Sequence, residues 1–180
     1  MSFDNYIYAN FNFEFNKMIR KINKNKYSNL VFICIGTNKI VGDSLGPITG
    51  EILKRNLERR NIKIFGDLSN NVNTHNITQK IAYIKRCYDN PYIISIDSAL
   101  SETIVPETVY ILKTGMIPGS ALKKNLSRIG NASIKGIVGK DEKNLIKNYY
   151  NLAKADYRLV LRLSKNISKI IINSIKFLNL

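Results

Sequence analysis

Five short apolar segments recur along the chain and predict five β-strands: residues 29–36, 62–66, 92–97, 108–113 and 133–139. The first is apolar without alternation, which is typical of a parallel strand that is buried on both faces. Other segments carry apolar residues at helical spacing and predict helices: 12–24, 47–61, a stretch around 77–84, and 142–178 with a break in its middle and Asp141 as its cap. Strands that alternate with helices predict an α/β protein in which helices cover both faces of a mostly parallel five-stranded sheet.

Length and composition predict one ordinary domain. The chain has 180 residues, of which 44% are hydrophobic, which is enough to bury a core. We expect a single domain, 1–180, with its core at 29–180 and an N-terminal extension at 1–28. The two cysteines, Cys34 and Cys87, form neither a disulfide framework nor a metal-binding pair, which favours a reduced, cytoplasmic environment.

Neither end of the chain is predicted to enter a membrane. Residues 1–20 contain Asp4 and Glu14 and lack an uninterrupted apolar segment, so we expect no signal peptide. Basic residues interrupt the apolar run 159–178, so we expect no membrane span there either.

The formal net charge of +15 raises the question of nucleic-acid binding. The lysines are scattered and form no stripe with interleaved aromatic residues. The abundance of Lys, Asn and Ile is also typical of proteins from AT-rich genomes. Nucleic acid is therefore not favoured as a partner, and an anionic surface or an acidic partner is the alternative.

Two aspartates lie directly after buried strands. Asp43 is in the turn that follows the first strand, and Asp97 ends the strand YIISID. Because open α/β sheets bind ligands beyond the carboxyl ends of their strands, adjacent strands would bring these carboxylates face to face. Each has a structural interpretation, Asp43 as a favourable charge at a helix N-terminus and Asp97 as part of a turn. The two together favour a functional site.

Paired carboxylates suit hydrolysis. Two neighbouring carboxylates do not both ionise readily, so they share a proton. One can then activate water while the other protonates a leaving amine. A bridging metal is the alternative, although transition-metal sites usually add a nitrogen or sulfur ligand. His75, the single histidine, is interpreted as a solvated or capping residue in a loop that could open onto the same crevice.

The residues around the aspartates are the candidate substrate-binding groups. Gly36, Thr37 and Asn38 open the turn 36–46, and Ser98 lies near the end of the third predicted strand. The turn is rich in glycine but matches neither a dinucleotide-binding nor a P-loop pattern, so phosphate binding is not favoured.

Three motifs carry a resemblance to a known family. In chain order they are GTNKIVGDSLGPITG, ISIDSALSE and IPGSALKKNLSRIGNASIKGIV, and together they resemble the YyaC-type sporulation proteins of spore-forming Firmicutes. These are similar to the germination proteases that degrade small acid-soluble spore proteins, and more distantly to hydrogenase maturation endopeptidases. The resemblance covers residues 29–165. It implies a phosphorylase/hydrolase-like fold, a three-layer α/β/α sandwich.

The resemblance also implies roles for individual residues. The positions of the catalytic aspartates of the germination proteases match Asp43 and Asp97. The Pro-Gly-Ser-Ala loop at Pro118 and Gly119 resembles a loop that borders the cleft. In the hydrogenase endopeptidases, the corresponding acids bind a metal together with a histidine. This chain has Lys135 at the histidine position, so we expect no metal or other cofactor and a lysine that can pair with a carboxylate.

The leading interpretation is an aspartate-dependent endopeptidase of the germination-protease type, in the cytoplasm or forespore of a sporulating bacterium. Its substrates would be proteins or peptides, such as small acid-soluble spore proteins. The alternative is a non-enzymatic module that binds a peptide or protein in the same crevice. A third interpretation, a peptidyl-tRNA hydrolase-like enzyme, is motivated by the basic charge and His75, but the matching motif around His75 is missing.

Overall fold

The computed structural model describes residues 3–24, 27, 29–57, 62–115 and 129–178. In these residues each predicted strand and helix has a counterpart. The N-terminal helix begins earlier than predicted and the third strand ends later. In chain order the elements are α1 (Phe3–Lys24), β1 (Asn29–Cys34), a 3-10 turn (Gly42–Ser44), α2 (Leu45–Leu57), β2 (Ile62–Phe65), α3 (Ile77–Cys87), β3 (Pro91–Ser101), β4 (Val109–Leu112), β5 (Ala132–Lys140), α4 (Leu145–Ala153) and α5 (Tyr157–Phe177).

The strands form one sheet in the order β2-β1-β3-β5-β4. β1 pairs in parallel with β2 and with β3, and β3 pairs in parallel with β5. β4 is antiparallel to β5 at one side of the sheet. The predicted mostly parallel five-stranded sheet is therefore confirmed. Because β1, β2, β3 and β5 run in one direction, their carboxyl ends lie along the same edge of the sheet, called the carboxyl edge below.

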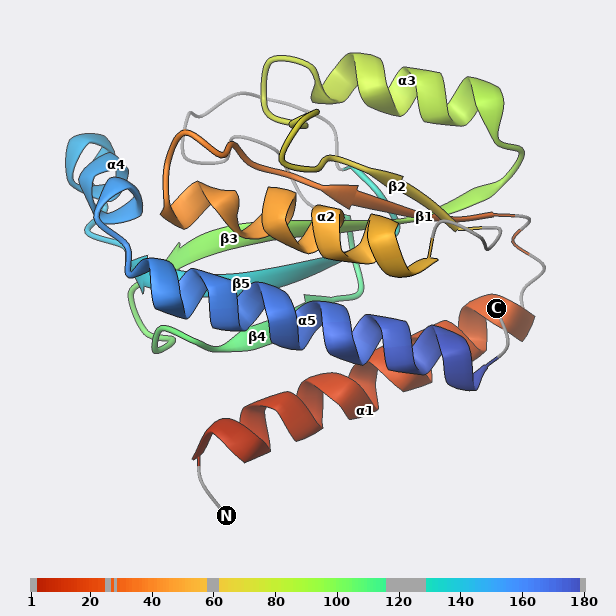
Figure 1. The fold of residues 1–180 in the computed structure, drawn as a ribbon, viewed down its shortest axis with the longest axis horizontal. Helices are drawn as coiled ribbons and strands as arrows, with labels where there is room; N and C mark the ends of the chain where they lie inside the picture. The colour runs from red at the N-terminus through yellow and green to blue at the C-terminus, as the bar shows by residue number, and fades with distance from the viewer. Residues whose placement is uncertain (1–2, 25–26, 28, 58–61, 116–128, 179–180) are drawn as a thin grey trace.

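Helices cover both faces of the sheet, which makes the predicted three-layer α/β/α sandwich (Figure 1). α2 and α5 lie side by side on one face, α1 packs against α5 and β4, and α3 covers the opposite face. Alternate residues of β1 supply the two cores. Phe32 and Cys34 pack in the core with α2 and α5, whereas Val31 and Ile33 pack with α3. Burial on both faces explains the apolar run without alternation.

α1 is part of the core, although the sequence indicated an N-terminal extension at 1–28. Phe11, Phe15 and Ile19 lie on one side of the helix and are at most 2% exposed. They belong to the same buried cluster as the inner side of α5. Phe13, between them, points away and is 64% exposed. Asn, Glu and Lys separate the apolar residues of this segment. The apolar side of the helix was therefore hard to recognise in the sequence.

α2 lies close to the sheet because two of its residues are glycines. A Cβ atom at Gly46 would overlap the backbone carbonyl of Ile35, at the end of β1. A Cβ atom at Gly50 would overlap the carbonyl of Gly66, which follows β2. This close approach determines where α2 begins, and therefore where the preceding turn lies.

The break predicted within 142–178 separates α4 from α5. Asn144 caps α4, because its side chain accepts hydrogen bonds from the N–H groups of Ile146 and Lys147 at 3.0 and 3.1 Å. The prediction of Asp141 as the cap is wrong, since Asp141 instead accepts hydrogen bonds from the N–H of Lys143 in the loop and from the side chain of Asn148 within α4. Among the described residues, α5 and the other helices are too short or too polar to cross a membrane.

Candidate active site at the carboxyl edge

The turn between β1 and α2 brings Asp43 back to the end of β1. Gly36 opens the turn with a φ of +141°, and a Cβ atom there would overlap the backbone carbonyl of Asp43. The N–H of Thr37 donates to the same carbonyl at 3.1 Å. The 3-10 turn Gly42–Ser44 then leads directly into α2. A glycine at position 36 therefore allows the chain to close tightly around Asp43.

Asp97 lies on β3, the strand next to β1. The N–H of Ile35 donates to the carbonyl of Ile96 at 2.7 Å, which joins the end of β1 to β3 immediately before Asp97. On the other side, Asp97 is in register with Lys135 of β5, and Lys135 Nζ lies 2.6 Å from Asp97 Oδ2. Both side chains are largely buried, with exposed fractions of 16% for Lys135 and 15% for Asp97. The expected pairing of Lys135 with a carboxylate is confirmed.

The pKa of Asp43 is raised to about 7. Burial of the carboxyl group is the main cause, and the negative charge of Asp97 acts in the same direction. The N–H of Thr37 and the positive charge of Lys135 lower this pKa, with smaller effects. Near neutral pH, Asp43 is therefore divided between its two protonation states, which suits a group that gives or accepts a proton during a reaction.

The donor set at this position does not fit a metal ion. Lys135 already places an ammonium group against Asp97, and a cation held by Asp43 and Asp97 would be repelled by it. His75 is exposed in the loop after β2. Within the described residues, no three His, Cys, Asp or Glu side chains gather in a way that could hold a metal. We therefore derive no chemistry through a metal.

The predicted substrate-binding residues differ in their surroundings. Asn38 is exposed, and its side chain donates to the carbonyl of Leu68 at 2.9 Å, which ties the Asp43 turn to the loop after β2. Ser98 is 8% exposed on β3. Pro118 and Gly119 lie outside the described residues. Substrate binding by this set, including Gly36 and Thr37, stays a prediction.

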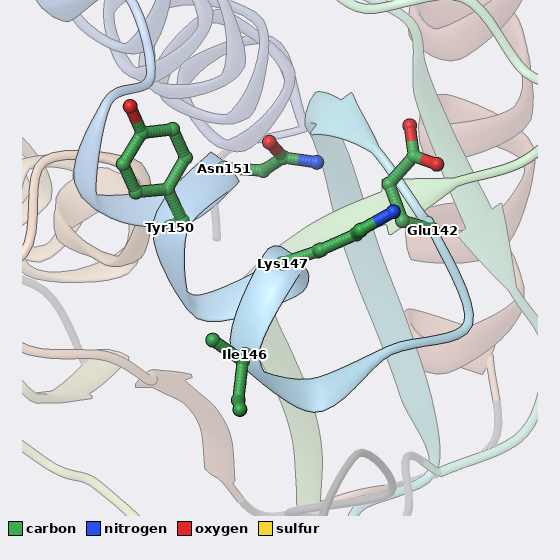
Figure 2. A pocket seen from close by; sticks show the side chains of 5 residues that line it. All are labelled: Glu142, Ile146, Lys147, Tyr150 and Asn151. Atoms are coloured by element: carbon green, nitrogen blue, oxygen red, sulfur yellow. The ribbon is translucent and has the colours of Figure 1, made fainter.

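A pocket of about 410 Å³ lies against α4, where the sequence indicated no site. Figure 2 shows its lining, which includes neither aspartate: Glu142, Ile146, Lys147, Tyr150 and Asn151. α4 nevertheless adjoins the Asp43 turn. A Cβ atom at Gly42 would lie 2.8 Å from the backbone carbonyl of Leu152. The sequence signal for this surface was the run of Leu, Ile and Tyr in α4, which is unusually apolar for an exposed helix.

A comparison with protein families assigns the chain to one of them. The family model described as "Protein of unknown function (DUF1256)" matches residues 3–170. The chain belongs to this family. The match begins at the first residue of α1 and so includes the helix that joins the core.

A curated relative confirms the resemblance to the YyaC-type proteins. The protein named "Uncharacterized protein YyaC" of Bacillus subtilis (strain 168) is 34% identical over 109 residues. The match covers 61% of this chain and 53% of the relative, so the chain spans about half the length of that protein. The likeness to germination proteases stays a prediction.

A solved structure shares the fold. The crystal structure of a [NiFe] hydrogenase maturation protease, HycI from Thermococcus kodakarensis KOD1, is similar with a TM-score of 0.55 at 15% identity. The similarity covers 86% of this chain and 99% of that one. The chain therefore has the α/β fold of that protease, and the likeness shows the fold alone.

Proposed function

We propose that this chain is an aspartate-dependent endopeptidase of the germination-protease type, with Asp43 and Asp97 as its catalytic pair. The observation that carries the proposal is Asp43, a partly buried carboxyl group whose pKa is raised to about 7 beside a second carboxylate. Carboxyl groups perturbed in this way gather at catalytic sites, because ionising them costs free energy that a structural role does not require. The protease-like fold agrees with this function.

Peptide hydrolysis by the pair consumes one water molecule. One carboxylate accepts a proton from water as the water oxygen bonds to the carbonyl carbon of the scissile peptide. The second carboxyl group of the pair, which was protonated from the start, then donates its proton to the amide nitrogen as the C–N bond breaks. The products are a new carboxyl end and a new amino end. Transfer of the proton from the first aspartate to the second restores the pair.

The substrate in this proposal is an extended polypeptide. Small acid-soluble spore proteins are the first candidates, in the cytoplasm or forespore, during sporulation or germination. The formal net charge of +15 favours association with acidic polypeptides in general.

The outer side of α4 is the proposed docking surface for apolar side chains of that polypeptide. Its exposed residues, Leu145, Ile146, Tyr149 and Tyr150, have exposed fractions of 54–82%, and no residue of α4 is buried. Exposed apolar surface of this kind marks interaction sites. Ile146 and Tyr150 also line the pocket in Figure 2. Because α4 adjoins the Asp43 turn, a polypeptide bound there lies close to the carboxyl pair.

The test is cleavage of a small acid-soluble spore protein, and of β-casein as an unfolded acidic probe. The wild type is compared with Asp43→Asn, Asp97→Asn and the double variant. Asparagine keeps the shape of aspartate but cannot transfer the proton, so each single variant should lose about 100-fold or more in kcat/KM. Because the two groups act as a unit, the double variant should be hardly worse than either single variant.

Circular dichroism and Tm establish that each variant is folded. Undiminished cleavage by both single variants would exclude the carboxyl pair as the catalytic group. A wild-type protein that binds both probes and cleaves neither would support the alternative function, a peptide-binding module on the same fold.

The α4 docking surface is tested with Ile146→Ser. Loss of an apolar contact worth about 1.5 kcal/mol should raise KM for β-casein about tenfold and leave kcat unchanged. Phe177→Ser is the matched control, because Phe177 is 73% exposed and is the last residue of α5, whereas α4 lies next to the start of α5 (Figure 1). Equal KM values for the two variants would remove α4 as the docking surface and leave the carboxyl pair untouched.

A further inference from the structure

Among the ion-paired lysines that the structure describes, Lys135 has the least exposed side chain. Its side chain is 16% exposed. In the surface pairs Lys113–Glu14 and Lys143–Glu102, the lysines are 68% and 73% exposed. Taking an ammonium group out of water is costly unless a carboxylate compensates it closely. The hydrolysis described above makes no use of Lys135, so its burial needs another explanation.

The sheet itself directs Lys135 to Asp97. The two residues are paired in register on the parallel strands β3 and β5. Backbone pairing, and not the reach of a flexible side chain, therefore brings Nζ to 2.6 Å from Asp97 Oδ2. At that distance the ammonium group and the carboxylate form a short, charge-assisted hydrogen bond.

We infer that Lys135 is a positioning residue of the carboxyl site, which holds Asp97 ionised and so makes Asp97 the base and Asp43 the proton donor. The inference rests on the proposed hydrolytic function. It adds a third residue to that site. It also states which aspartate acts as the base and which as the proton donor, a choice that the carboxyl pair alone does not determine.

The charges around Asp43 agree with this division. Asp97 of β3 faces it with a negative charge, Lys135 of β5 acts on it with a positive charge, and the N–H of Thr37 lies at the turn. α4, which packs against the same turn, contributes the apolar Leu152 there. With Lys135 present, the three groups carry a net charge of zero when Asp43 is protonated. Without Lys135, the same state would carry a net negative charge, and the burial of Asp43 would still favour its proton but no cation would compensate Asp97.

The test compares Lys135→Met, which keeps the length without the charge, with Lys135→Arg, which keeps the charge. Carboxyl 13C NMR titrations of Asp43 and Asp97 follow protonation without any need for cleavage. The pH dependence of kcat/KM on β-casein follows the reaction. In Lys135→Met, the titration midpoint of Asp43 should move upward by about one pH unit and kcat should fall about tenfold, with KM unchanged. Lys135→Arg should restore the midpoint and most of kcat.

Lys113→Met is the matched control, because it breaks a lysine–carboxylate pair away from the site and should leave both titrations unchanged. Lys135→Gln replaces the methionine variant if that variant does not fold. Titration midpoints that are the same without the Lys135 charge overturn the inference. If the midpoints move but the wild type cleaves no probe, the hydrolytic function fails while the control of the two carboxyl groups by Lys135 stands.

Discussion

Replacing Asp43 with asparagine should stabilise the folded chain by about 2–4 kcal/mol near pH 8, and change its stability little near pH 4. The pKa of Asp43 is about 7 in the folded chain, compared with an ordinary value of 3.8. Below the ordinary value the carboxyl group is protonated in both the folded and the unfolded chain, so asparagine offers no advantage. As the pH rises towards 7, the unfolded chain releases this proton more readily, and the wild type loses stability.

The size of the effect follows from the difference in pKa. Each pKa unit corresponds to about 1.36 kcal/mol, so a rise of about three units sets an upper limit near 4 kcal/mol. Partial access of water to the site reduces it. Urea unfolding of wild type and Asp43→Asn at several pH values between about 4 and 8 measures the difference directly.

Asp141→Asn is the control with the opposite behaviour. The side chain of Asn148 holds the pKa of Asp141 below its ordinary value. Its stabilising effect is therefore complete above the ordinary value and is lost only at lower pH. Between about pH 4 and 8, the difference between Asp141→Asn and wild type should stay constant. If the free energy of unfolding of Asp43→Asn also differed from that of wild type by the same amount at every pH between about 4 and 8, the burial of Asp43 would be contradicted. A gain in stability together with a loss of cleavage would mark Asp43 as a residue retained for chemistry.

Gly46→Ala should destabilise the fold by about 2–3 kcal/mol, although alanine is the better helix former by about 1 kcal/mol. The new Cβ atom would overlap the carbonyl of Ile35, a backbone atom that cannot turn aside as a flexible side chain would. α2 must therefore move away from β1. Since the 3-10 turn with Asp43 leads directly into α2, we also expect weaker cleavage.

Asn56→Ala provides the comparison within the same helix. Asn56 is exposed, so alanine there adds helix propensity without a steric conflict. Its stability should lie within about 0.5 kcal/mol of wild type in urea unfolding. If Gly46→Ala were as stable as Asn56→Ala, the close approach of α2 to β1 would not determine the position of the helix.

The central part of the fold could be predicted because its hydrophobic signal is strong. The run from Val31 to Ile35 is buried on both faces, so it read as a central parallel strand. The signal was weaker where polar residues interrupt an apolar stripe, and α1 was separated from the core for this reason. Near α4, Asp141 and Asn144 are both good capping residues. Which of them caps α4 depends on where the backbone enters the helix, and this cannot be read from a sequence pattern.

The candidate site was predictable in part. Asp43 and Asp97 each follow an apolar run, so their closeness could be inferred from strand direction. The prediction that Asp97 ends its strand is wrong, because β3 continues to Ser101, and Asp97 lies just beyond the end of β1 instead. The register that places Lys135 opposite Asp97 depends on which strands are neighbours, and the chain enters β5 only after β4. The exposed face of α4 escaped prediction because apolar residues at helical spacing usually indicate a buried face. In the part of the chain that the structure describes, α4 follows the end of β5 and none of its residues is buried.

The pairing of β1, β3 and β5 also has a consequence for the newly synthesised chain. The site combines residues from the turn after β1, from β3 and from β5, which are distant in the sequence, and contacts of this kind form late, since long loops must close first. β5 ends at Lys140, so most of the chain must leave the ribosome before Lys135 can reach Asp97. A nascent or truncated chain therefore lacks the assembled carboxyl site. If the folded protein is a peptidase, its activity begins only when synthesis is nearly complete. Incomplete chains that are synthesised side by side therefore do not cleave one another.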